Sequence, residues 1–315
     1  MHTNGICSIM IKTNLVLIEK DVLEAMQRIE TADLKKLTID EIEAYLTPLF
    51  TGYRATAPRF NKGLHIYRGR KCAKPISLKE VIYPLPSSIR RLGRANDIGE
   101  SLFYAANGRS VPFFELDCKP GDLIALTKWK TNKKAIVNHI GYSPEIASQL
   151  GSGRSLGDLY DFIISTRSYS SLNSKVHDYL ALKFSKKISG NSQHSYKLTV
   201  AIARKLFKNN MFDGLLYPTM AMSGNGDNIV FKCDYVDKHL EFLSIEYIKI
   251  KYKSGMIYDF EILDSSTIVD KKGNFVWSGR PLQNILKEKG QKLTMVSENG
   301  EWVAYDTDGN RVYLE

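Results

Sequence analysis

Residues 93–116 read GRANDIGESLFYAANGRSVPFFEL and predict a strand, a turn and a second strand in the middle of the chain. The first strand, SLFYAA, contains Tyr104, and the apolar segment VPFFEL carries Glu115 near its end. Arg94 precedes both, so a cation, an aromatic ring and a carboxylate follow one another. This combination suits a site for a phosphorylated ligand that contains a ring, because guanidinium groups bind phosphate and aromatic rings stack on flat rings.

The composition is that of a globular protein with anionic partners. The chain has 315 residues, of which 43% are hydrophobic and 25% charged, so it can bury a sizeable core in one or two domains. The net charge of +10 favours nucleic acids, nucleotides or an acidic protein as partners. Nucleic acid is not expected, because the alternation of lysines with Ile250 and Tyr252 in residues 249–253 fits a solvated strand face equally well.

Other classes of protein are not expected from the sequence. The N-terminal residues lack a basic region and a small-residue cleavage site, and no apolar run reaches 18 residues, so we expect neither a signal peptide nor a membrane span. The four cysteines are scattered and no HExxH motif occurs, so we expect no disulfide framework, no metal site and a cytoplasmic location.

The chain changes texture along its length and predicts an α+β fold. Residues from about 19 to 50 predict a helical N-terminal region, in which Thr38 and Glu41 form a capping box. From Leu64 the pattern is β-rich. We divide the chain into a helical region (1–62), a central domain (63–240) and a β-rich C-terminal region (241–315).

Inside the central domain, residues of about 143 to 210 predict helices. Ser143 and Pro144 mark the start of the first, and Gly151 its end. Three more are predicted at 156–166, 175–184 and 195–210. Strands are predicted at 64–68, 123–129, 215–217 and 229–231. In the C-terminal region, hairpin turns are predicted at 272–274, 299–300 and 308–309, a helix near 282–289, and a β-meander around Trp277 and Trp302.

The candidate site residues each have a plainer alternative. Arg68 and Arg70 are two residues apart on a strand, so both point to one side and could bind phosphate, or form a solvated basic edge. Arg94 follows Gly93, which permits a close backbone approach, but could be a surface arginine. Tyr104 could stack on a ligand or belong to the core.

Glu115 and residues 219–228 present the same choice. A carboxylate in the apolar segment VPFFEL is costly unless it is paired or functional. It could pair with an arginine, or stabilise the positive charge that develops on a ribose when a glycosidic bond breaks. The loop TMAMSGNGDN, residues 219–228, suits an anion-binding nest of backbone amides, or is simply a hairpin loop.

Taken in order, these motifs resemble those of the RES domain family, bacterial proteins that degrade NAD and often act as toxins of toxin–antitoxin pairs. IYR at Arg68, GRANDIG at Arg94, LFYAA at Tyr104 followed by Glu115, and DGLLYPTMAMSGNGDNIVF are similar to the family's motifs. The resemblance covers about residues 64–235 discontinuously. It departs from the family at Ala95, where tryptophan is usual, and at Thr219, where serine is usual.

The resemblance implies an ADP-ribosyltransferase-like fold with a split β core, and cleavage of the nicotinamide–ribose bond of NAD without a metal or further cofactor. It implies that Arg68 and Arg94 hold the pyrophosphate, that Tyr104 packs on the nicotinamide side, and that Glu115 orients the ribose. Residue 219 would line the loop that binds the ligand. The full set of implied site residues is Glu115, Arg68, Tyr104 and Thr219 for catalysis, and Arg94, Asn96, Tyr67, Ser223 and Asn228 for binding.

Three functions remain open from the sequence. The first is an NAD glycohydrolase or phosphorylase that uses water or inorganic phosphate, with a possible antitoxin protein as partner. The second is an ADP-ribosyltransferase that modifies a macromolecule at the same site. The third is an interaction module whose site is degenerate, which the threonine at position 219 keeps open.

Overall fold

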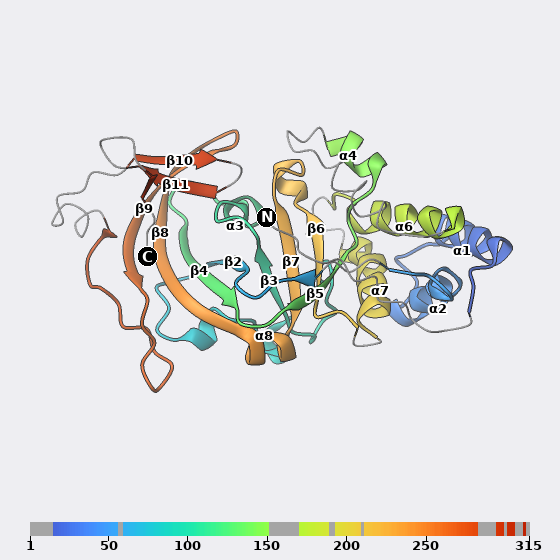
Figure 1. Ribbon diagram of the computed structural model, residues 1–315, viewed down its shortest axis with the longest axis horizontal. Coiled ribbons are helices and arrows are strands. Elements are labelled where there is room, and N and C mark those ends of the chain that lie inside the picture. Colours follow the sequence, from blue (N-terminus) through green and yellow to red (C-terminus); the bar gives the residue numbers. More distant parts are fainter. Residues whose placement is uncertain are drawn as a thin grey trace.

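One curved mixed sheet runs through the molecule, with helices gathered at one end of it (Figure 1). The computed structural model describes residues 15–55, 59–150, 170–188, 193–208, 211–282, 294–298, 301–305 and 311–312. The sheet has nine strands in the order β1-β5-β6-β7-β3-β2-β4-β8-β9. Only the β5–β6 pair is parallel among these strands. The described residues therefore form an α+β fold.

The bounds of the elements are as follows. The strands are β1 (Arg59–Phe60), β2 (His65–Lys71), β3 (Leu102–Ala106), β4 (Leu123–Thr131), β5 (Ala135–His139), β6 (Gly214–Pro218), β7 (Asp227–Lys232), β8 (Leu240–Ser254) and β9 (Ile257–Ser266). A separate three-stranded sheet consists of β10 (Thr294–Glu298), β11 (Glu301–Tyr305) and β12 (Arg311–Val312). The helices are α1 (Glu19–Thr31), α2 (Ile39–Phe50), α3 (Val111–Glu115), α4 (Pro144–Leu150), α6 (Ser171–Phe184), α7 (Tyr196–Phe207) and α8 (Cys233–His239).

The helical N-terminal region predicted for residues of about 19 to 50 is confirmed and consists of two helices. α1 ends at Thr31, and α2 begins anew at Ile39. The capping box is confirmed: Thr38 accepts from the Glu41 amide, and the Glu41 carboxylate accepts from the Thr38 amide at 2.7 Å. This cap starts a helix, so the same residues that strengthen α2 also separate it from α1.

The helix predicted to start at Ser143 and Pro144 is confirmed as α4, with Ser143 Oγ accepting from the Ile146 amide. The helices predicted near 175–184 and 195–210 are α6 and α7. The predicted helices at 156–166 and 282–289 lie wholly or almost wholly outside the described residues, as do Gly151 and the turn at 308–309.

Two apolar cores lie on opposite faces of the central strands. The helices α1, α2, α6 and α7 pack together over Leu215, Tyr217 and Val230 of β6 and β7. The other core includes Phe103 and Phe231, whose side chains point to the opposite face because they alternate with Tyr104 and Val230. We call the face that carries Tyr104, Tyr217 and Val230 the α7 face.

The short helix α3 corrects the prediction of a second strand after Tyr104. Residues Val111–Glu115 are helical, and Val111, Pro112, Phe113 and Phe114 are all buried. A run of four apolar residues has no visible period, so its sequence does not distinguish a buried strand from a buried turn of helix. Pro112, in the first turn of α3, suits a helix start.

The sheet continues across the predicted boundary at residue 240. β8 pairs with β4 from Leu240 onward, and β9 pairs with β8. Along β8 the buried apolar residues change from odd-numbered to even-numbered positions. Ile245 packs into a core on one face of the sheet, whereas Ile248 and Ile250 pack into the core under α3 on the other face. Residues 240–266 thus extend the sheet of the central domain.

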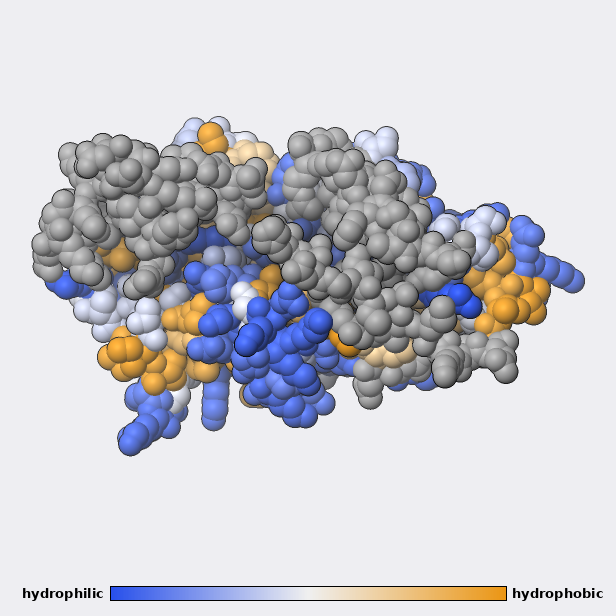
Figure 2. Space-filling view, in the orientation of Figure 1, coloured by the Kyte–Doolittle hydropathy of each residue, from blue (hydrophilic) through white to orange (hydrophobic). Residues whose placement is uncertain are grey.

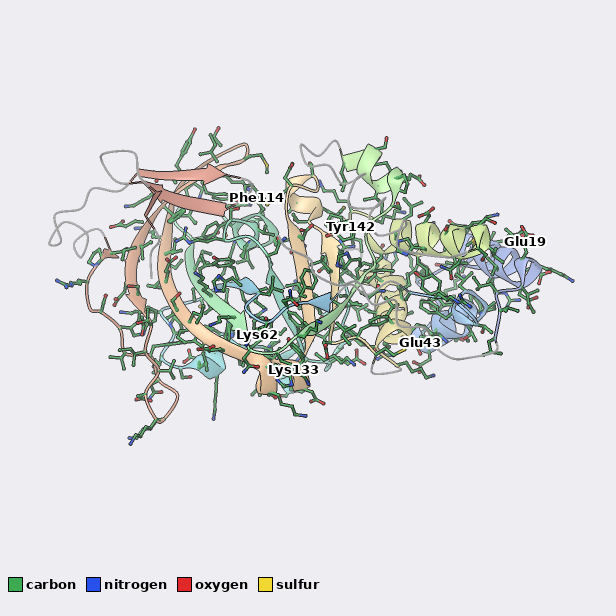
Figure 3. All side chains as sticks on the ribbon, in the orientation of Figure 1. Glu19, Glu43, Lys62, Phe114, Lys133 and Tyr142 are labelled. Carbon is green, nitrogen blue, oxygen red and sulfur yellow. The ribbon has the colours of Figure 1, made fainter. Side chains whose placement is uncertain are left out.

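Hydrophilic residues gather over the lower middle of the visible face, where the labelled Lys62 and Lys133 lie (Figures 2 and 3). Both lysines are exposed. No helix of the described residues is long and apolar enough to cross a membrane.

Asp264, at the end of β9, ties the C-terminal segment to the loop after β2. Its carboxylate accepts from Lys74 Nζ, from the Ser278 hydroxyl and from two backbone amides, and its side chain is 5% exposed. Nearby, Trp277 donates to the Pro75 carbonyl at 3.1 Å. Burial by itself raises the pKa of Asp264, but the hydrogen bonds from Lys74 and Ser278 outweigh it and hold that pKa below the ordinary value.

We expect Asp264→Ala to lower the free energy of unfolding at pH 7 by about 1–3 kcal/mol, because it removes the buried acceptor that Lys74, Ser278 and two backbone amides share. The folded-state pKa of Asp264 lies below the unfolded value, so its contribution is complete above the unfolded pKa and disappears as the pH falls through the folded pKa. Urea denaturation from pH 7 down to pH 3 should therefore show the variant and the wild type converging at the acid end. The exposed Asp259→Ala on the same strand is the control, and an equal loss in both variants would contradict this role.

Candidate functional site

The carboxylate of Glu115 is held between α3 and the sheet. Its Oε1 accepts hydrogen bonds from the Thr219 hydroxyl and from Asn228 Nδ2, the latter at 2.7 Å. Thr219 is fully buried and Asn228 is 8% exposed, whereas Glu115 is exposed. No described residue donates to the second carboxylate oxygen of Glu115. The group therefore has a fixed orientation and one oxygen available to a ligand.

Two glycines allow α3 to lie close enough for this contact. A Cβ at Gly69 of β2 would lie 2.8 Å from Pro112 Cβ, and one at Gly226 would lie 2.5 Å from Val111 Cγ2. Real Cβ atoms essentially never make such short contacts, so a larger residue at either position would displace α3. Figure 3 shows Phe114, the residue before Glu115, on this helix.

We expect Gly69→Ala to lower the free energy of unfolding by about 1–3 kcal/mol, because the methyl group would push Pro112 away from the sheet. Moving Pro112 also moves Glu115, three residues later on the same helix. Urea denaturation measures the stability, and the exposed His65→Ala on the same strand is the comparison. An unchanged stability in Gly69→Ala would show that α3 is not held by this close approach.

Tyr217 lies next to Asn228 in the sheet and connects two groups of polar residues. The two residues are partners in the β6–β7 register, so their side chains share one face. Burial raises the pKa of Tyr217 well above its ordinary value, Tyr104 and Glu115 raise it further, and Arg94 opposes them. Tyr217 is thus within electrostatic range of both Arg94 and Glu115.

Arg94 is anchored at the helical end of the same face. Its NH1 donates to the Phe184 and Lys186 carbonyls at the end of α6, and its guanidinium carbon lies 5.8 Å from the centre of the Tyr217 ring. Its NH2 has no hydrogen-bond partner among the described residues. One edge of the guanidinium is therefore committed to the fold, and the other can bind an anion.

Tyr104 and Asn96 support the turn that presents Arg94. The Tyr104 hydroxyl donates to Asn96 Oδ1 at 2.8 Å and accepts from the Ala95 amide at 2.9 Å. Burial raises the pKa of Tyr104 well above its ordinary value, so this hydroxyl stays protonated. A Cβ at Gly93 would lie 2.2 Å from Asn96 Oδ1, which explains the glycine at that position. The Tyr104 hydroxyl and the Asn96 side chain thus both serve to fix the turn that carries Arg94.

Arg68 points to the opposite face of the sheet from Glu115. Its Nε donates to the Val81 carbonyl at 3.1 Å, its NH1 donates to the Tyr104 carbonyl at 2.7 Å, and it lies over the Phe103 ring. Burial is the main cause that lowers the pKa of this guanidinium to about 10, and Arg70 lowers it further. The structure therefore does not bring Arg68 together with Glu115. Successive side chains of β2 point to opposite faces, so Arg68 lies on the face opposite to that of Tyr67.

The loop of residues 219–228 is ordered by its own hydrogen bonds. The amides of Thr219, Ser223, Gly224 and Asn225 all donate to carbonyls of the loop. These four amides are therefore not available to an anion, and they favour the hairpin-loop alternative for this part of the loop. Ser223 is exposed, has a positive φ of 49°, and does not donate a hydrogen bond to Glu115.

The structure thus joins some predicted site residues and separates others. Glu115, Thr219 and Asn228 form one hydrogen-bonded cluster, and Arg94 lies near it beyond Tyr217. Tyr67 belongs to the same face, as a partner of Ala106 beside Asn228. Tyr104 and Asn96 support the Arg94 turn, while Arg68 and Ser223 lie apart from the cluster.

Sequence reasoning missed Tyr217. Its signal was present, because Tyr217 ends the predicted strand 215–217 and directly precedes the Pro218–Thr219 pair. The residue opposite it across the sheet could not be assigned before the register was known.

Within the described part of the chain, no group of three or more His, Cys, Asp or Glu side chains could hold a metal ion. A scan against protein-family models found no match. Searches of curated proteins and of solved structures found no significant match either.

Proposed function

We propose that this protein consumes NAD by breaking the bond between nicotinamide and ribose, with water or inorganic phosphate as the acceptor. The observation that carries the proposal is the Glu115 carboxylate, which is oriented by two buried donors and open on its other oxygen. The order of motifs similar to those of the RES family supports it as well.

The chemistry asks for little beyond positioning and charge. The bond between C1′ and the ring nitrogen breaks, its electron pair stays on nicotinamide, and the positive charge moves from the pyridinium to the ribose. A fixed carboxylate stabilises the oxocarbenium-like ribose in the transition state. Water then adds at C1′ and loses a proton to solvent, or phosphate adds as an anion. Glu115 acts as the charged partner of the ribose throughout.

Thr219 takes the part of the family's serine in this proposal. The Thr219 hydroxyl donates to Glu115, which supports this role. This contact favours a functional site over a degenerate one. The free edge of Arg94 lies beyond Tyr217 on the same face and would contact an anionic part of the ligand.

In the finer description of the fold, we propose an ADP-ribosyltransferase-like split β core. β2 and β3 are paired only at Tyr67 and Ala106, and the Arg68 guanidinium donates to the Tyr104 carbonyl where the strands diverge. Arg68 would then be a positioning residue that holds the split, in place of the phosphate-binding role predicted from the sequence.

The test uses the purified full chain with NAD carrying a label on the adenosine side, in phosphate buffer and in a phosphate-free buffer. The proposal predicts free nicotinamide in at least one buffer, together with labelled ADP-ribose or its 1″-phosphate. Label transferred to a macromolecule would assign the protein to the ADP-ribosyltransferases instead. Intact NAD in both buffers would refute the proposal.

A further inference from the structure

A row of side chains crosses six strands of the sheet and passes through Asn228. Successive pairs in the strand registers place these residues opposite one another, so their side chains share the α7 face. The row consists of Tyr217, Asn228, Ala106, Tyr67, Lys128 and Ser244. Asn228 of this row belongs to the Glu115 cluster, and Lys128 lies three strands away from Asn228.

Lys128 is the cation of this row. It is partly buried on β4 and has no ion pair or hydrogen bond within the described ranges of the chain. Lys130, two residues further along β4, differs in that it lies 3.9 Å from Glu241. An ammonium group without a partner in the described residues can form a charge-assisted hydrogen bond with an anionic ligand.

Glu246, a carboxylate on the neighbouring strand, is paired with another cation. Glu246 lies on β8 opposite Leu126, one step along the strands from Lys128. Its Oε2 forms an ion pair with Arg109, whose guanidinium also lies over Phe260. Because Glu246 pairs with Arg109, it is not an ion-pair partner of Lys128.

We propose that Lys128 binds the phosphate next to the nicotinamide ribose. This inference rests on the proposed function and adds the residue that recognises the phosphate. Asn228 and Lys128 are separated by three strand spacings, a backbone distance of roughly 14 Å. Glu115 contacts Asn228 at one end of this interval and Lys128 lies at the other, so a ribose with its phosphate would span the two. Tyr67 lies between Asn228 and Lys128 in the row, so its ring would lie under the sugar.

Lys128 takes the part predicted from the sequence for Arg68. The Arg68 guanidinium donates to two backbone carbonyls and lies on the opposite face, so it cannot reach a ligand at Glu115. Arg94, on the same face as Glu115, lies on the other side of Tyr217. Lys128 is then the cation on the strand side of the site.

The test compares three substrates that differ in phosphate: nicotinamide riboside, nicotinamide mononucleotide and NAD. Lys128→Met is expected to raise KM at least about tenfold for the mononucleotide and NAD, since a charged hydrogen bond is lost. It is expected to leave nicotinamide riboside, which has no phosphate, unchanged. Lys128→Arg should keep most of the affinity, and Lys130→Met, on the same strand, should behave as the wild type.

An equal effect of Lys128→Met on all three substrates would overturn the inference, and so would no effect on any of them. Binding of nicotinamide mononucleotide to the Glu115→Gln protein, measured by calorimetry, separates this failure from that of the proposed function. Binding that is unaffected by adding Lys128→Met refutes the phosphate site alone. If the wild type leaves NAD intact and Glu115→Gln does not bind the mononucleotide, both proposals fail.

Discussion

Glu115→Gln is expected to lower the rate of nicotinamide release from NAD by about 10²–10³-fold. Glutamine has the same shape, and its carbonyl oxygen can still accept from Thr219 and Asn228, so the local structure should survive. Only the negative charge that stabilises the ribose cation is lost. Release of free nicotinamide, measured by chromatography at saturating NAD, gives the change in kcat.

The matched control for Glu115→Gln is Asp117→Asn, two residues further on. Asp117 is an exposed carboxylate whose partners are Lys253 and Lys119 at the surface. It has a positive φ of 42°, which asparagine tolerates well. This variant should keep the wild-type rate. A Glu115→Gln protein with normal stability and an undiminished kcat would remove Glu115 from the reaction.

Thr219→Val is expected to lower kcat by about 10–100-fold, while Thr219→Ser stays within a few-fold of the wild type. Valine keeps the methyl group and the volume of threonine but cannot donate to Glu115. The Glu115 carboxylate then loses one of its two donors. Position 219 is fully buried, so water does not replace the lost hydroxyl there. Serine keeps the donor and loses a methyl group, which tests the hydroxyl separately from packing.

Steady-state kinetics on both Thr219 variants measure this difference. A positioning role predicts that the loss appears mainly in kcat, because Thr219 acts on the ribose through Glu115. Equal activities of Thr219→Val and Thr219→Ser would show that the hydroxyl is not needed. In that case the contact with Glu115 would be structural only.

The sequence predicts helix starts well where the capping hydrogen bonds join residues that are close in the chain. The Thr38–Glu41 capping box and the Ser143–Pro144 helix start depend on residues three positions apart, and both are present in the structure. α3 was mistaken for a strand because its apolar residues are buried on all sides and show no period.

The site was harder to predict because it depends on which face of the sheet each strand presents. Glu115, Thr219 and Asn228 were selected individually, but only the packing of α3 on Gly69 shows that they meet. Arg68 was assigned to the same pocket. Its face could not be known without the register of β2 against its neighbours.

Lys128 is a residue that the sequence alone does not single out for the site. Its segment, LIALTKW, was correctly predicted as a strand. Nothing local distinguishes this lysine from other lysines of the chain, and its place in the row with Asn228 follows from three successive strand pairings. Such pairings join residues that are up to 122 positions apart, and single-sequence periodicity carries no information about them.

The most direct test of the central claim is a crystal structure of the Glu115→Gln protein with NAD bound. We predict that the side chain at position 115 lies within hydrogen-bond distance of a hydroxyl of the nicotinamide ribose, on the α7 face of the sheet. The adjacent phosphate should lie beside Lys128. NAD bound on the opposite face beside Arg68, or remote from position 115, would contradict this account.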